Sequence, residues 1–158
     1  GAAAIKIASL LKYESAGTVE FLFDETTKEF WFLEVNTRLQ VEHPVTEEVT
    51  GIDLVREQLK IANEEPLDFS QEDIEWFGSS IEVRLYSEDP GNNFLPVTGK
   101  LIAFEPTEDP LVRWDTGVET GSEITPNFDP MLAKIISYGE TRVEAANKLA
   151  LALSLIHI

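Results

Sequence analysis

The chain has 158 residues and carries 29 acidic against 12 basic side chains, which gives a formal net charge of −17. This excess of carboxylates argues against nucleic-acid binding, because contacts with phosphates require clustered Lys and Arg. Apolar residues make up 43% of the chain, too much for a disordered acidic tail, so we expect a folded protein. The lack of cysteine excludes disulfides and thiolate metal sites, and no apolar run approaches the roughly 20 residues of a membrane helix.

Three elements are predicted in the first half of the chain. Residues 2–12 have apolar side chains at helical spacing and predict a helix; because no cap precedes it, we interpret the start of the chain as a cut inside an element. Two β-rich runs, 18–24 and 29–35, are joined by a short polar turn and predict a hairpin. A second helix is expected over 53–63, with Asp53 as its N-cap.

The second half of the sequence is typical of short strands separated by Pro and Gly turns. A polar, turn-rich stretch over 64–78 predicts a boundary between a first domain, 1–70, and a second domain, 79–152. The closing helix is expected to begin with a capping box at Thr141 and Glu144. The predicted strands of this half are 81–86, 100–104, 112–115 and 132–138.

The last six residues need a separate interpretation. The closing helix continues without a stop signal into Leu-Ser-Leu-Ile-His-Ile at 153–158. These residues match a translation of the mosaic-end adaptor of transposase-based sequencing libraries, which suggests a sequencing artefact; the alternative is a genuinely apolar helix end. His157 is therefore given no functional weight.

Two carboxylates interrupt the apolar pattern of the hairpin. A register that sets Leu22 opposite Phe32 also sets Glu20 opposite Glu34, with Cβ atoms about 4.5–5.5 Å apart. Alternation along the strand places Glu34 on the same face as Phe32 and Asn36. Two like charges this close repel unless a hard divalent cation such as Mg²⁺ lies between them. A register one residue different would separate the glutamates, so two exposed glutamates on an edge hairpin remain an alternative.

A row of polar side chains follows the hairpin. In an extended segment Arg38, Gln40 and Glu42 lie on one side, with apolar residues between them on the other. An arginine can hold an oxyanion, an amide can orient it, and a carboxylate can accept its proton. The alternative is a solvated strand edge. His43 precedes a proline, and we expect a structural role for it.

These motifs together resemble the biotin carboxylase family of ATP-grasp enzymes. The resemblance is carried by Leu-Glu-Val-Asn-Thr-Arg-Leu-Gln-Val-Glu-His-Pro-Val-Thr-Glu at 33–47, preceded by Ala-Gly-Thr-Val-Glu-Phe-Leu-Phe at 16–23. It extends through stretches at 50–59, 81–90, 93–96 and 129–135. It implies an α+β fold, with the C-terminal half of an ATP-grasp domain followed by a β-rich, truncated biotin carboxylase C-terminal domain. Acyl-CoA carboxylases and urea carboxylases are equally compatible parents.

The resemblance also implies cofactors and partners. Members of the family use ATP with Mg²⁺ or Mn²⁺ to activate bicarbonate and carboxylate biotin, which is usually tethered to a carrier domain. A carrier domain and a carboxyltransferase are therefore the expected partners, in a parent that is a homo-oligomer. The expected location is the cytoplasm, or the mitochondrial matrix in a eukaryote.

The family's functional residues can be carried over to matching positions of this chain. Glu42 matches the base that deprotonates bicarbonate, and Arg84 matches the arginine that stabilises the biotin enolate. The residues implied to hold bicarbonate are Arg38, Gln40, Glu42 and, through its backbone amide, Val41. The residues implied to contact ATP or its metal ion are Glu20, Glu34 and Asn36, with Leu22 and Leu33 near the adenine. For the two leucines, ordinary core packing is an almost equal alternative.

Some parts of the family pattern have no counterpart in this sequence. The family's N-terminal domain, its glycine-rich lid and its nucleotide-binding lysines would lie upstream of Gly1, so we expect the isolated chain to be inactive. Two other hypotheses are a fragment of a different ATP-grasp ligase and a non-catalytic acidic metal-binding module. The lack of a spaced Asp-x-Asp-x-Asp-Gly loop argues against the acidic module.

Overall fold

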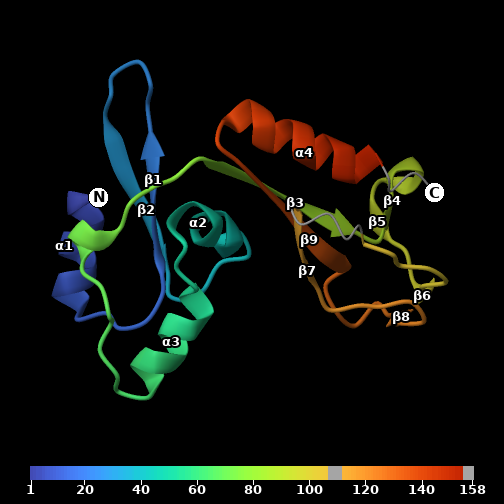
Figure 1. Ribbon diagram of the computed structural model, residues 1–158, viewed down its shortest axis with the longest axis horizontal. Coiled ribbons are helices and arrows are strands. Elements are labelled where there is room, and N and C mark those ends of the chain that lie inside the picture. Colours follow the sequence, from blue (N-terminus) through green and yellow to red (C-terminus); the bar gives the residue numbers. More distant parts are fainter. Residues whose placement is uncertain (107–111, 155–158) are drawn as a thin grey trace. The chain divides into compact units, whose positions relative to one another are not determined.

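The computed structural model describes residues 1–106 and 112–154 (Figure 1). The chain forms two compact units, each with its own contacts: unit 1 comprises residues 1–43 and 51–75, and unit 2 comprises 44–50 together with the chain from Trp76 onward. Both units contain α-helices and small antiparallel sheets, so the predicted α+β fold is confirmed.

Unit 1 begins with a helix and a hairpin. Helix α1 (Ala2–Leu11) ends where Lys12 adopts a left-handed conformation, with a φ of 49°. Strands β1 (Thr18–Phe23) and β2 (Phe30–Asn36) pair antiparallel, as the alternating pattern predicted. In the turn between them, the Asp24 carboxylate accepts hydrogen bonds from the backbone amides of Thr26 and Thr27, at 2.7 and 3.2 Å. These two bonds lower the pKa of Asp24.

Two short helices follow the hairpin. The predicted second helix is α3 (Leu54–Ala62), and its N-cap is confirmed, because the Asp53 carboxylate accepts a hydrogen bond from the Arg56 amide at 2.8 Å. The helix before it, α2 (His43–Thr50), was not predicted. Pro44 stands in its first turn, where the missing proline N–H costs nothing.

A three-stranded antiparallel sheet is the centre of unit 2. Its strand order is β3 (Ser79–Tyr86), β9 (Met131–Gly139) and β7 (Val112–Thr116), so three of the four strands predicted in the second half are confirmed. Central strand β9 is the most buried, with Ile135 and Ile136 at 0% and 1% exposure. Leu149 and Ala152 of α4 (Arg142–Ser154) join Val112 and Ile135 in one apolar cluster.

The remaining strands are two-residue ladders. Strand β4 (Glu88–Asp89) pairs with β5 (Leu95–Pro96), and β6 (Gly99–Lys100) pairs with β8 (Glu123–Ile124); single 3₁₀ turns span Gln71–Asp73 and Pro90–Asn92. The strand expected over 100–104 is wrong, because β6 ends at Lys100. The Phe104 amide donates to the Thr120 hydroxyl at 2.8 Å, a side-chain acceptor that replaces the backbone partner of a ladder.

The cap of α4 corrects one detail of the prediction. The Thr141 hydroxyl accepts a hydrogen bond from the Glu144 amide at 3.2 Å, as a capping box requires. The Glu144 carboxylate, however, accepts from the Glu140 amide at 3.1 Å rather than from that of Thr141. The Ser137 hydroxyl also donates to the Ala145 carbonyl at 2.8 Å, which fixes the start of α4 against β9. Residues 155–158 of the predicted artefact lie outside the described residues, so that interpretation stays a prediction.

Candidate functional site

The register of the hairpin brings the two predicted metal carboxylates together. Glu20 of β1 is paired with Glu34 of β2, and Thr18 is paired with Asn36. This part of the predicted register is confirmed. Glu20 is half-buried and Glu34 is exposed, so the pair lies where solvent or a ligand can reach it.

A β-bulge corrects the rest of the register. After Glu20 the pairing shifts, so that Phe21 faces Phe32 and Leu33 is left as the extra residue of β2. Leu22 consequently faces Trp31 and not Phe32, contrary to the prediction. The bulge therefore shifts Phe32 out of phase with Glu34 in the alternation of side chains along β2.

Aromatic contacts show which face Phe32 occupies. The ring of Phe21 makes edge-on contacts with Phe30 and Phe32, at centroid distances of 5.4 and 6.3 Å. Since Phe21 follows Glu20 in the strand, its side chain points to the opposite face. Phe32 is thus on the other face from the carboxylates, and the expectation that Glu34 shares a face with Phe32 is wrong.

Two side-chain amides hold the carboxylates. The Asn36 nitrogen donates to Glu20 Oε1 at 2.7 Å and to Glu34 Oε1 at 3.2 Å. The Gln40 nitrogen donates to the same Glu20 Oε1 at 3.0 Å. Both donors are neutral, so they orient the oxygens without cancelling the two negative charges. Oxygen ligands of this kind suit Mg²⁺ or Mn²⁺.

The glutamate pair is only part of a complete coordination shell. Among residues 1–106 and 112–154, no group of three or more His, Asp or Glu side chains is placed to hold a metal ion. A six-coordinate ion bound at Glu20 and Glu34 would need further oxygens, which phosphates and water commonly supply to Mg²⁺.

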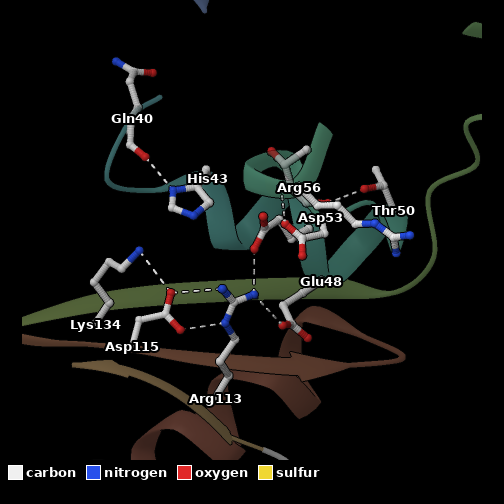
Figure 2. A network of polar contacts seen from close by, with 11 residues as sticks. Gln40, His43, Glu48, Thr50, Asp53, Arg56, Arg113, Asp115 and Lys134 are labelled. Carbon is white, nitrogen blue, oxygen red and sulfur yellow. Dashed lines mark hydrogen bonds and ion pairs between the residues drawn. The ribbon is translucent and has the colours of Figure 1, made fainter. Parts of the chain in front are cut away.

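The segment after the hairpin is not extended. Arg38 lies at a bend, and its guanidinium donates to the Leu39 carbonyl at 3.2 Å. The Gln40 carbonyl accepts from the His43 backbone amide at 3.3 Å and from His43 Nδ1 at 2.8 Å, the ring contact that Figure 2 shows. These bonds turn the chain into α2. The predicted row along one side of a strand is therefore wrong, whereas the structural role expected of His43 is consistent with its ring contact.

The remaining predicted residues lie on strands of both units. Arg84 is exposed on β3, in register with Lys134 of β9. Leu22 and Leu33 are 63% and 61% exposed, so among the described residues neither belongs to a core. They are two of the exposed apolar side chains of the hairpin, which occur on both of its strands. The exposed apolar side chains of the hairpin are Leu22, Phe23, Phe30, Trp31, Phe32 and Leu33.

Unit 2 contains an ion-pair network that the sequence did not predict (Figure 2). Arg113 on β7 bonds both carboxylate oxygens of Asp115, at 2.8 and 3.0 Å. Its Nη1 also contacts Glu47 and Glu48 of α2, at 2.8 and 3.3 Å, and Lys134 contacts Asp115 at 3.2 Å. The only available signal was the i, i+2 spacing of Arg113 and Asp115, which places both on one face of a strand.

The charges of this network shift two pKa values in opposite directions. Hydrogen bonding to the Asp115 carboxylate, which accepts from the guanidinium, is the largest influence on Arg113 and raises its pKa, against an opposing effect of burial. For Asp115 the largest single influence is burial, which raises the pKa, but the hydrogen bonds and positive charges of Arg113 and Lys134 together outweigh it and lower the pKa. Both groups are therefore stabilised in their charged forms.

Comparison with known proteins gives two family matches along the chain. Residues 1–70 match the ATP-binding domain of the carbamoyl-phosphate synthase L chain, and residues 82–158 match the biotin carboxylase C-terminal domain. These two matches define the chain as an ATP-binding segment followed by a biotin carboxylase C-terminal segment. The chain belongs to the biotin carboxylase family.

Individual relatives agree with these matches. Biotin carboxylase 2 of Bacillus subtilis is 51% identical over 97% of the chain, and the human mitochondrial propionyl-CoA carboxylase alpha chain is 50% identical over 97%. The biotin carboxylase domain of 2-oxoglutarate carboxylase from Hydrogenobacter thermophilus, solved with MgADP, ADP and bicarbonate, superposes with a TM-score of 0.92 at 41% identity over 98% of the chain.

The chain is much shorter than these relatives. It spans 34% of the Bacillus subtilis enzyme, 21% of the human alpha chain and 34% of the solved Hydrogenobacter chain. In the described part of the chain, no helix combines the length and apolar character that crossing a membrane requires.

Proposed function

We propose that this chain supplies the metal carboxylates and the bicarbonate-holding residues of a biotin carboxylase, an enzyme that uses MgATP and bicarbonate to carboxylate biotin on a carrier domain. The observation that carries the proposal is the pairing of Glu20 with Glu34, with Asn36 donating to both carboxylates. In a relative of the same family, a solved structure holds MgADP and bicarbonate together.

Glu20, Glu34 and Asn36 form the proposed metal and nucleotide set. The carboxylates supply hard anionic oxygens for Mg²⁺ or Mn²⁺, and Asn36 holds them in one orientation. When bound, MgATP supplies the phosphoryl group that activates bicarbonate. Leu22 and Leu33 are exposed apolar side chains of the same hairpin, which suits a contact with the adenine.

The turn after the hairpin carries the proposed bicarbonate set. Arg38 would hold the anion through its guanidinium, with help from the Gln40 amide and the Val41 backbone N–H. Glu42, an exposed carboxylate in this turn, would accept the proton that bicarbonate loses. On unit 2, Arg84 would stabilise the enolate form of biotin.

The family relation extends the proposal to the setting of the enzyme. The parent would work with a biotin carrier domain and a carboxyltransferase, as a homo-oligomer, in the cytoplasm or in the mitochondrial matrix. The chain alone would be inactive, because the glycine-rich lid and the nucleotide lysines of the family have no counterpart in residues 1–158. We further propose that its two domains are 1–70 and 79–152.

The role of Glu42 can be tested in an active enzyme. Residues 1–152 would replace the matching segment of Bacillus subtilis biotin carboxylase 2, whose 51% identity favours correct folding. We expect Glu42→Ala to lower kcat for biotin-dependent phosphate release by at least about 100-fold, the usual loss for a general base, with little change in the KM for MgATP. Glu25→Ala, at an exposed glutamate of the hairpin turn, is the matched control.

Three outcomes would contradict the proposal. If Glu42→Ala carboxylates biotin at the rate of the parent enzyme, Glu42 is not the base. If Glu34→Gln leaves the Mg²⁺ dependence unchanged, the hairpin is not the metal site. Biotin-dependent phosphate release by the 158-residue chain on its own would refute the predicted inactivity.

A further inference from the structure

Gln40 makes a contact that lies outside its proposed role with bicarbonate. Its side-chain nitrogen donates to Glu20 Oε1 at 3.0 Å, across 20 positions of sequence. Its backbone carbonyl is also engaged, by the amide and the ring of His43 at 3.3 and 2.8 Å. The residue is therefore fixed at both ends, with its main chain in the turn and its side chain on the hairpin.

The side-chain amides of Asn36 and Gln40 both donate to the same oxygen of Glu20. Asn36 and Gln40 both donate to Oε1, at 2.7 and 3.0 Å. A carboxylate held twice through one oxygen loses freedom of rotation, while Oε2 takes part in neither of these bonds. Neutral donors behind a carboxylate orient it for a metal ion without competing for its charge, and such supporting bonds commonly strengthen metal binding.

We propose that Gln40 is a positioning residue for the metal carboxylate Glu20, and that its amide couples the metal site to the turn that carries Arg38 and Glu42. The inference rests on the proposed function for the metal role of Glu20. It adds that metal binding depends on Gln40 even when bicarbonate is absent. By linkage, anything that fixes Gln40 in this conformation strengthens metal binding, and metal binding in turn favours this conformation of the turn.

The test is a Mn²⁺ titration of the full 158-residue chain in carbonate-free buffer, with free Mn²⁺ followed by electron paramagnetic resonance. Leaving out bicarbonate removes any contribution from the proposed anion contact. We expect Gln40→Leu, which keeps the side-chain size but has no donor, to weaken Mn²⁺ binding about 10-fold, as losses of supporting hydrogen bonds typically do. Gln58→Leu is the matched control, because Gln58 is also half-buried in unit 1 but donates to Ser15 at 3.2 Å.

A second measurement needs no substitution. In proton–nitrogen spectra of the unsubstituted chain, adding diamagnetic Mg²⁺ should shift the side-chain NH₂ signals of Gln40 and Asn36 and leave those of Gln58 in place. This readout remains usable if Gln40→Leu fails to fold, which thermal unfolding of each variant would reveal.

Different results would overturn the positioning role of Gln40 and the metal role of the hairpin on which it rests. If Gln40→Leu binds Mn²⁺ as the unsubstituted chain does, or loses no more affinity than Gln58→Leu, Gln40 does not position Glu20. Unmoved Gln40 signals on Mg²⁺ addition would overturn the inference in the same way. If Glu34→Gln leaves Mn²⁺ affinity unchanged, the metal role of the hairpin fails, and the inference fails with it.

Discussion

Replacing Arg113 by leucine should destabilise unit 2, because it removes the shared cation of three carboxylates. Arg113 contacts Glu47 and Asp115 at 2.8 Å and Glu48 at 3.3 Å. Only 9% of the Glu47 side chain is exposed, so without Arg113 a largely buried negative charge would lose this ion pair. Lys134 would still contact Asp115 at 3.2 Å.

The free energy of unfolding that Arg113→Leu removes should lie between the values typical of buried and of exposed ion pairs. Removing one partner of a buried pair costs about 3–5 kcal/mol, whereas exposed pairs are worth about 0–1 kcal/mol. The Arg113 side chain is 35% exposed, so solvent screens part of the interaction. We therefore expect Arg113→Leu to lower the free energy of unfolding of unit 2 by about 1.5–3 kcal/mol.

Hydrogen exchange can measure this loss in unit 2 alone. Amide exchange of peptides from β9, followed at increasing urea concentration, reports the opening of the central strand. Arg56→Leu, at an exposed arginine of unit 1, is the matched control and should leave β9 unchanged. Adding Glu47→Gln to Arg113→Leu should recover about 1 kcal/mol, because it removes the largely buried negative charge that has lost its ion pair with Arg113. A loss below about 0.5 kcal/mol, or no recovery in the double variant, would refute the reasoning.

Three further predictions concern the folded chain. Asp115→Asn should lower the free energy of unfolding by about 1 kcal/mol at pH 7. Because the folded pKa of Asp115 lies below its ordinary value of 3.8, this loss should shrink as the pH falls below that value and vanish once the pH has passed the lowered pKa; urea unfolding at stepwise lower pH from pH 7 would check it. Gly78→Ala should disrupt the pairing of β3 with β9, because Gly78 has a φ of +63° and an added Cβ would overlap the backbone carbonyl oxygen of Gly139, which cannot move aside as a side chain can. A melting temperature within about 2 °C of the unsubstituted chain would contradict this. Asp53→Ala should lower helix stability by about 1 kcal/mol through loss of the N-cap, and amide exchange across α3 should detect it; unchanged exchange would count against the cap.

The sequence predicted the hairpin and its carboxylate pairing, because a strand pattern interrupted by two glutamates limits the registers that place both on one face. It could not predict the bulge. Leu33, the extra residue, is as apolar as Phe32 and Trp31 beside it, and all three are about half exposed or more. With apolar residues at every position, alternation gives no indication that one residue is out of phase.

The sequence did not predict helix α2, because its residues have low helix propensity, and it did not predict the Arg113 network, because its members lie far apart in the sequence. The α2 sequence, His-Pro-Val-Thr-Glu-Glu-Val-Thr, has four β-branched residues in eight, which lowers helix propensity; the one helix signal was Pro44 in its first turn. Arg113 and Glu47 are 66 positions apart. Periodicity describes single elements and contains no information about pairing over such a separation.

The placement of α2 has a consequence for recombining this chain with its relatives. The match to the ATP-binding domain ends at residue 70 and therefore includes α2, yet residues 44–50 pack with unit 2, where Pro44 and Val49 are buried and Arg113 meets Glu47 and Glu48. A crossover placed between the two family domains would join α2 from one parent to β7 from another. Such hybrids should inherit Glu47, Glu48 and Arg113 as one matched set, even though the set spans the boundary between the two family matches.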